Sequence, residues 1–298
     1  MTATRPPLSV CVATTAGWPM IEPCLRSFLE DARHMGVEIL VADGSGCPPP
    51  TDPDILSVVA WTSTPAESVF RLVADNLRRA TGEVVVLTED HCTARPGWVP
   101  AIVRAHAEQT AAAAVGGAIE NGEPTAPLRW ASHLMTQGAH MAPLRNGPSQ
   151  RIANEANVSF KRSALADIDD HPLGFLTIAH LRRLAGDGGV LVTDDRIVVD
   201  HHEDLVGRAT AVIHFDDGRT IAAFRRQRMG RGDWLRLLAA PVLPLYRTVR
   251  VVRAAVGRGR GGEVLAALPW LLLLEYCHEA GEVAGYVLGP GRSPYGLR

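Results

Sequence analysis

Three consecutive side chains that can bind a metal ion, Glu89, Asp90 and His91, follow the apolar run Glu83–Leu87. Side chains alternate between faces on an extended backbone, so Glu89 and His91 share one face and Asp90 lies on the other. A carboxylate and an imidazole together suit Mn²⁺ or Mg²⁺, ions that keep coordination positions open for phosphate oxygens. The alternative is a polar strand end that enters a loop and binds nothing.

Other polar side chains stand at similar positions. Thr14 and Asp43 each end an apolar run, and Asp43 either accepts hydrogen bonds from a ligand or simply opens the Asp-Gly-Ser-Gly turn. Asn76 lies on an apolar helix stripe and therefore needs a buried partner, as a ligand contact or as a structural hydrogen bond.

His201 and His202 follow the run Ile197–Asp200. We expect His202 to complete the metal site; the alternative is a histidine that lies on the surface and binds nothing.

The elements that must position these groups alternate between strand and helix patterns. The expected strands are Leu8–Thr14, Val37–Asp43, Ile55–Trp61 and Glu83–Leu87, and the expected helices are Met20–Met35 and Pro65–Ala80. Such alternation predicts an α/β fold with a mostly parallel sheet and flanking helices on both faces. Ligands bind outside the carboxyl ends of the strands in these sheets, so Thr14, Asp43 and the Glu89–His91 segment are expected at one rim.

The pattern is less regular after residue 110. We expect a strand at Ala114–Glu120, a short helix at Leu128–Gln137 and a strand or turn at Asn157–Phe160. Val190–Thr193 and Ile197–Asp200 are expected to form a hairpin around two aspartates. Gly257–Gly262 nominally contains G-x-G-x-x-G but follows no strand, which indicates a flexible basic loop and not a dinucleotide site.

Composition excludes several classes of protein. A net charge of −2 over 298 residues argues against a dedicated nucleic-acid binder. Five cysteines without a C-x-x-C pair indicate neither a zinc ribbon nor a disulfide framework, which fits a reducing compartment. The first residues lack a charged segment followed by a long apolar core, so no secretory signal is expected and the predicted location is cytoplasmic.

Taken in order, these segments resemble the family 2 glycosyltransferases, which have a GT-A-type fold, over roughly residues 8–230. LSVCVATTAGWPMIEPCLRSFL resembles their first strand, loop and helix, and VEILVADGSG resembles the second strand with its nucleotide-binding Asp. ADNLRRATGEVVVLTEDHCTARPGW resembles the stretch from an Asn-bearing helix to the metal-binding D-x-D and the following Pro-Gly-Trp. ANVSFKRSAL resembles a later segment near the acceptor site.

The resemblance implies roles for individual residues. Asp43 contacts the base or ribose of a nucleotide, and Glu89, Asp90 and His91 stand in place of the D-x-D. Trp98 packs beneath the site and Asn157 lines it. Thr14, Asn76 and Asp90 complete the expected donor-binding set, with a divalent ion, Mn²⁺ or Mg²⁺, as cofactor.

The catalytic base is where the sequence departs from the family. Inverting members place an acidic residue before the last strands, but the matching position falls near Leu176-Thr177, and neither can deprotonate a sugar hydroxyl. Asp169, Asp170 or His171 could substitute, because a base need only reach the acceptor hydroxyl. Asp170 is the candidate we retain; the alternative is a chain that binds donor without turnover.

The C-terminal segment, residues 231–298, is expected to be helical and separate from a catalytic domain of residues 1–230. Ten arginines and one acidic residue, Asp233, lie between residues 225 and 260, followed by the uncharged run Val264–Leu274. That run is shorter than the roughly 20 residues that span a bilayer. Arginine-rich apolar helices with Trp and Tyr instead predict association with an anionic membrane surface. The expected position is peripheral, on the inner face of the cell membrane; the alternative is a helical subdomain packed on the core or on a second copy.

The expected activity is inverting transfer of a sugar from a nucleoside-diphosphate donor to an acceptor hydroxyl on a glycan or a lipid. A nucleotidyltransferase is one rival, although the loop ATTAGWPM lacks the basic residue of such enzymes. A non-catalytic nucleotide-sugar-binding or scaffold protein at a membrane is the other, favoured by the missing base.

Overall fold

A computed structural model describes residues 5–166, 168, 171–203, 207–227 and 229–297. They form two compact units. The first contains the described residues up to Glu120 together with His140–His202, and the second contains Asn121–Ala139 and Glu203–Leu297. The boundary expected at residue 230 therefore lies inside the second unit, because helix α7 (Arg208–Arg226) packs along helix α10 (Gly261–Leu288).

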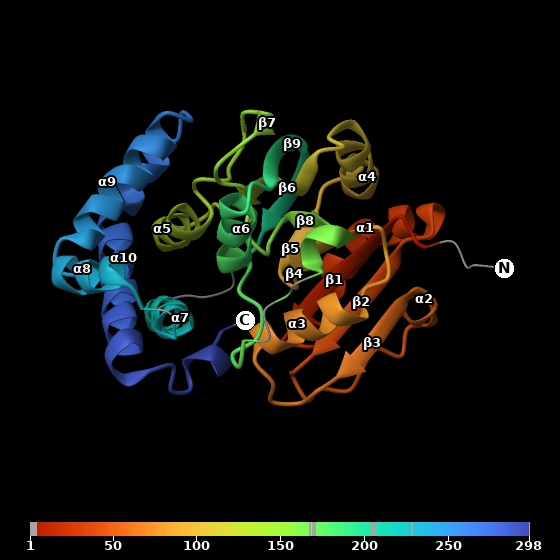
Figure 1. Cartoon of the computed structure of the whole chain (residues 1–298), viewed down its shortest axis with the longest axis horizontal. Helices are drawn as coiled ribbons and strands as arrows, with labels where there is room; N and C mark the ends of the chain where they lie inside the picture. The colour runs from red at the N-terminus through yellow and green to blue at the C-terminus, as the bar shows by residue number, and fades with distance from the viewer. Residues whose placement is uncertain (1–4, 167, 169–170, 204–206, 228, 298) are drawn as a thin grey trace. The chain divides into compact units, whose positions relative to one another are not determined.

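One mixed sheet organises the first unit (Figure 1). Within the described residues its nine strands run in the order β3-β2-β1-β4-β8-β6-β9-β5, and β7 pairs with β9. The strands are β1 (Leu8–Thr14), β2 (Glu38–Asp43), β3 (Val59–Ser63), β4 (Val84–Glu89), β5 (Cys92–Ala94), β6 (Ala112–Asn121), β7 (Gly147–Pro148), β8 (Val158–Lys161) and β9 (Val190–His201).

The sheet is parallel only in its N-terminal half. Strand β1 runs parallel to β2 and β4, and β2 runs parallel to β3. Strand β8 is antiparallel to both β4 and β6, and β5 and β7 are antiparallel to β9. The expected mostly parallel sheet is therefore wrong for the later strands, whose short apolar runs carried no information on direction.

Helices cover both faces of this sheet. They are α1 (Glu22–Met35), α2 (Pro53–Leu56), α3 (Val69–Arg79), α4 (Trp98–Glu108) and α6 (Thr177–Gly186), with a 3-10 turn at Arg162–Leu165. Alternation along β1 separates two cores: Val10 and Val12 pack with α1 and α4, whereas Cys11 packs with α3 and α6. The predicted stripe of α1 is confirmed, because Leu25, Phe28, Leu29 and Ala32 are all buried.

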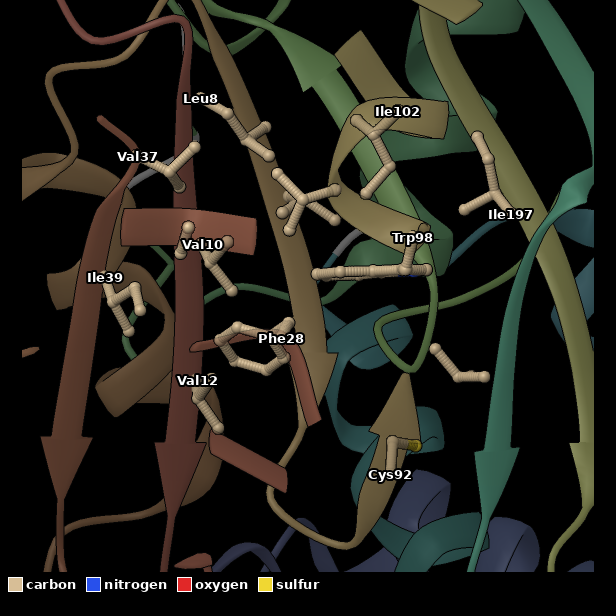
Figure 2. Close-up of a cluster of buried hydrophobic side chains, with 14 of the residues drawn as sticks. Leu8, Val10, Val12, Phe28, Val37, Ile39, Cys92, Trp98, Ile102 and Ile197 are labelled. Atoms are coloured by element: carbon tan, nitrogen blue, oxygen red, sulfur yellow. The ribbon is translucent and has the colours of Figure 1, made fainter. Parts of the chain in front are cut away.

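The α1–α4 core centres on two aromatic rings. The rings of Phe28 and Trp98 lie 5.5 Å apart at a tilt of 38°, a favourable aromatic arrangement. Figure 2 shows them among Val10, Val12 and Cys92. Because β5 carries Cys92 directly after His91, this core lies next to the polar rim of the sheet.

Two elements differ from the sequence expectation. Residues 55–61 do not form one strand: Asp52 caps α2 by accepting the Asp54 amide at 2.9 Å, and β3 follows it. The expected hairpin at 190–200 is the single strand β9. The Asp194 carboxylate accepts from the Arg196 amide at 3.0 Å, and the Asn146 side chain accepts from the Asp195 amide at 2.8 Å, so the aspartates have partners without a turn.

The second unit is helical, as predicted for its C-terminal part. It comprises α5 (Pro127–Thr136), α7, α8 (Arg231–Ala239), α9 (Leu243–Val256), α10 and a 3-10 turn at Ser293–Tyr295. Glycines allow α7 and α10 to approach closely, since a Cβ at Gly281 would collide with the Phe215 carbonyl and one at Gly218 with the His278 carbonyl. Among the described residues, no helix is long and apolar enough to cross a membrane.

Candidate functional site

The strand register brings the predicted polar residues to one rim. Thr14 of β1 pairs with Asp43 of β2, which pairs with Ser63 of β3. On the other side of β1, Ala13 pairs with Glu89, so Thr14 lies beside Asp90. The carboxyl ends of four strands thus finish level, and their polar side chains face one edge of the sheet, where ligands bind in folds of this type.

Three side-chain atoms converge at this rim from two distant parts of the chain. The Nε2 atoms of His91 and His201 are 3.0 Å apart. The Oε2 atom of Glu89 lies 3.2 Å from His201 Nε2 and 3.5 Å from His91 Nε2. A divalent ion with bonds of roughly 2.1 Å holds neighbouring ligand atoms about 3.0 to 3.4 Å apart, so the three atoms already stand at coordination spacing.

The chemistry of this set also fits a divalent ion. One carboxylate oxygen and two imidazole nitrogens suit Mn²⁺, and three protein ligands leave positions open for other oxygens. The Cys92 thiol lies behind the group, with Glu89 Oε2, Cys92 Sγ and a ring nitrogen of His201 all within 4.8 Å of one another. Burial raises the pKa of the Cys92 thiol well above its usual range.

The histidine at this position is His201, whereas the sequence expectation named His202. His201 is the last residue of β9 and pairs with Cys92 of β5, on the face that buries Ile197 and Val199. The ring of His202 lies on the other face, where its Nε2 is 2.8 Å from Thr93 Oγ1. Three successive apolar residues, Ile197–Val199, had hidden which parity of the strand faces inward.

Asp90 uses both carboxylate oxygens within the protein. Its Oδ2 accepts from Thr14 Oγ1 at 2.6 Å, and its Oδ1 lies 2.8 Å from His91 Nδ1. With the Nδ1 proton directed at Asp90, the lone pair of His91 Nε2 points at the Glu89–His201 group, which is how carboxylates commonly orient metal-binding histidines. Thr14 Oγ1 also accepts from the Gly17 amide at 2.8 Å, which ties the loop after β1 to the same group.

Asp43 presents an unsatisfied acceptor. Its Oδ1 accepts from the Ser45 amide at 2.8 Å, which is the turn role considered above. Its Oδ2 is buried and has no hydrogen-bond partner among the residues that the structure describes. A buried carboxylate oxygen is costly to leave unpaired, so this atom is suited to accept from a hydroxyl or ring N–H of a ligand.

The two asparagines make structural contacts. Asn76 Nδ2 donates to the Val12 carbonyl at 2.9 Å, while its buried Oδ1 has no partner within the described part of the chain. Asn157 Oδ1 accepts from Trp98 Nε1 at 2.9 Å, and its Nδ2 donates to the carbonyls of Ala118 and Ile197 at 2.8 and 3.0 Å. Asn157 therefore joins α4, β6 and β9, and its donor-binding role stays a prediction.

The base position implied by the family resemblance contains no proton acceptor of the required kind. Leu176 precedes α6 and Thr177 begins it, buried, in the helix that leads to β9. The candidates Asp169 and Asp170 lie outside the described residues. His171 is described, and its Nδ1 accepts from the Leu173 amide at 3.1 Å.

No protein-family model and no curated protein matches this chain. Solved structures do match. A mannosyltransferase, PcManGT from Pyrobaculum calidifontis in complex with GDP-Man and Mn²⁺, is 18% identical with a TM-score of 0.58, covering 93% of this chain and 86% of that one. GalNAc-T7 with UDP, GalNAc and Mn²⁺ is 14% identical with a TM-score of 0.52, covering 67% of this chain and 44% of that one. The chain therefore has the GT-A-type fold of glycosyltransferases.

Proposed function

We propose that the protein transfers a sugar from a nucleoside-diphosphate donor to an acceptor hydroxyl, assisted by Mn²⁺ or Mg²⁺ at Glu89, His91 and His201. The observation that carries the proposal is the spacing of these three ligand atoms, 3.0 to 3.5 Å, at the carboxyl ends of the parallel strands. The GT-A-type fold supports it, as do the GDP-Man and Mn²⁺ of one similar structure and the UDP, GalNAc and Mn²⁺ of the other.

Each residue of the site has a separate task in this reaction. A divalent ion bound there supplies positive charge for the departing diphosphate. Asp90, fixed by Thr14, orients the His91 ring, and the unpaired Oδ2 of Asp43 accepts a hydrogen bond from the base or ribose of the donor. These groups are held by the sheet before any donor arrives, so little reorganisation opposes binding.

We further propose that transfer inverts the anomeric carbon and that Asp170 removes the proton of the acceptor hydroxyl. The acceptor is a glycan or a lipid-linked sugar. Inversion follows from the resemblance to family 2 glycosyltransferases. Asp170 is the candidate base because direct in-line attack by the acceptor needs one proton acceptor on its side of the sugar, and Leu176-Thr177 at the family's usual position supplies none.

A thermal-shift screen with UDP-, GDP- and dTDP-sugars, each with and without Mn²⁺, tests the donor site. We expect one donor class to raise the melting temperature only with metal, and Glu89→Ala to remove that shift. Glu83→Ala, which removes an exposed carboxylate just before β4, is the matched control and keeps it. No shift with any donor in the unsubstituted protein would contradict the proposed site.

Product analysis then separates this function from its rivals. Transfer or donor hydrolysis in the unsubstituted protein, lost in Asp170→Asn while the donor-induced shift remains, supports the base. Donor binding without any turnover would favour the non-catalytic binding protein. Release of pyrophosphate from a nucleoside triphosphate and a sugar phosphate would favour the nucleotidyltransferase.

A further inference from the structure

Large apolar side chains of α8 and α9 are exposed. On α8, Trp234 and Leu235 lie one turn before Leu238, and the three side chains are 62%, 66% and 80% exposed. Along α9, Val242, Tyr246 and Val249 recur at helical spacing and are also exposed. Soluble proteins rarely leave a contiguous apolar face of this kind uncovered without a partner. We call these six side chains and their surroundings the α8–α9 surface.

The first half of α10 extends this surface. Leu265 is 75% exposed, and Leu268, Leu273 and Tyr276 are exposed as well. The Tyr276 hydroxyl donates to the Pro241 carbonyl in the turn between α8 and α9, at 3.3 Å. Because Leu238 and Val242 lie within three residues of that carbonyl, the exposed faces of the three helices meet at this turn.

Three of the four glutamates of α10 do not reach this surface; the fourth, Glu263, is half-buried and pairs with Arg260 at 3.6 Å. Glu275, Glu279 and Glu282 are buried, and Arg247 of α9 pairs with Glu279 at 2.9 Å and with Glu282 at 2.6 Å. Arg225 of α7 pairs with Glu282 at 2.6 Å. These three glutamates therefore lie inside the helical unit, where Glu279 and Glu282 are paired with arginines.

The fully exposed charge of this segment is positive, while Asp233 and Glu263, its carboxylates that are not buried, are half-exposed and paired with Tyr286 and Arg260. Between residues 226 and 276, the exposed charged side chains of the described part are Arg226, Arg231, Arg250 and Arg253, with no exposed carboxylate among them. Arg250 and Arg253 stand on α9 beside Tyr246 and Val249. Apolar side chains with aromatic rings, bordered by arginines, match the two layers of a membrane surface: acyl chains below anionic headgroups.

We propose that the α8–α9 surface, continued by the first half of α10, docks on an anionic lipid bilayer and lies in its interface. Charge complementarity is the argument for this occupant. A second copy of the chain, related by a twofold axis, would bring the same arginines together, and the carboxylates of this segment that are not buried, Asp233 and Glu263, are half-exposed and already paired with Tyr286 and Arg260. The proposal goes beyond glycosyl transfer and does not depend on it.

Vesicle sedimentation with the full-length protein tests the proposal. We expect binding to phosphatidylcholine vesicles that contain phosphatidylglycerol, weaker binding as salt is raised, and little binding to phosphatidylcholine alone. Arg250→Gln with Arg253→Gln should lower the partition coefficient by at least about tenfold, since each basic residue contributes roughly fivefold near an anionic surface. Leu238→Glu should abolish sedimentation.

Leu56→Glu is the matched control, because Leu56 is an exposed leucine at the end of α2, in the other unit. It adds the same charge and should leave vesicle binding unchanged. Circular dichroism melts confirm that each variant folds, as expected for exposed positions. Equal binding to both kinds of vesicle, binding to neither, or a lipid-free dimer that Leu238→Glu dissociates would each overturn the proposal.

Discussion

The Nε2 atoms of His91 and His201 lie 3.0 Å apart although 110 residues separate the two histidines in the chain. Strand β9 runs antiparallel to β5 and ends opposite Cys92. Strand β9 therefore places His201 beside Glu89, which ends β4, and His91, which follows it. Both nitrogens also face Glu89 Oε2. Two imidazole nitrogens and one carboxylate oxygen at this spacing are donors of the kind that suit a divalent cation such as Mn²⁺.

The adjacent histidines provide a matched pair of variants. His201→Ala removes a ligand atom and should weaken Mn²⁺ binding by more than about tenfold. The bound follows because losing only a residue that orients a ligand already costs roughly 10- to 100-fold. His202→Ala should leave Mn²⁺ affinity nearly unchanged, since the His202 ring contacts Thr93. Isothermal titration with Mn²⁺ measures both. Equal losses in the two variants would contradict the assignment.

Asp90 is expected to act through His91. Asp90→Asn retains the shape of the side chain but removes the charge that fixes the His91 ring, so Mn²⁺ affinity should fall by roughly 10- to 100-fold. Thr14→Val removes only the hydroxyl that donates to Asp90, so it should also lower Mn²⁺ affinity, but by less than Asp90→Asn. A histidine NMR spectrum distinguishes this role from a general loss of structure, because only the His91 tautomer should change.

The sequence predicts the first half of this site better than the second. Continuous apolar strands place Thr14, Asp43 and Glu89 at one rim because parallel strands share the direction of their carboxyl ends. His201 could not be chosen over His202, because apolar residues occupy both parities of the strand before them. The direction of β8 and β9 was equally hidden, because an apolar run does not indicate whether its neighbour in the sheet runs parallel or antiparallel to it.

Some polar residues taken for ligand contacts were explained only by tertiary structure. The buried Asn157 side chain makes three hydrogen bonds to groups on α4, β6 and β9, and no local sequence pattern announces partners that are 39 to 59 residues away. Likewise, the sequence shows the glutamates of α10 only as charged residues that interrupt an apolar run. Their arginine partners come from α7 and α9, far along the chain, and only the structure identifies them.

Asn157 is expected to contribute strongly to stability. Asn157→Ala leaves the Trp98 indole N–H and the carbonyls of Ala118 and Ile197 without their buried partner, at about 1–3 kcal/mol for each unpaired group. We therefore expect the free energy of unfolding to fall by about 3 kcal/mol or more in urea titrations. Trp98→Phe leaves the amide of Asn157 bonded to both carbonyls and should retain more stability than Asn157→Ala. A larger loss of stability in Trp98→Phe than in Asn157→Ala would contradict the role of Asn157 in joining α4, β6 and β9.

Two glutamates of α10 should respond to pH in opposite ways. Burial raises the pKa of Glu275 to about 7 from an ordinary 4.5, and Arg247 offsets this only in part, since its Nη1 lies 3.8 Å from Glu275 Oε2, beyond hydrogen-bond distance. The native state then binds a proton that the unfolded chain has lost, so stability falls as pH rises from 4.5 to 7. Glu275→Gln, uncharged at every pH, should be more stable than the unsubstituted protein at pH 8, by up to about 3 kcal/mol. That gain should disappear towards pH 4.5.

Glu282 is the counterpart two turns along α10. Burial opposes its charge, but His278, Arg225 and Arg247 outweigh burial and lower its pKa to about 2. Its contribution to stability is therefore fully present above pH 4.5 and is lost as pH falls through 2. Glu282→Gln should destabilise the protein at neutral pH by about 3–5 kcal/mol, because it leaves the buried arginines without their carboxylate. Thermal melts of both variants between pH 4.5 and 8 test this difference. Changes in melting temperature of the same sign at pH 8 would show that the two carboxylates do not differ in charge state.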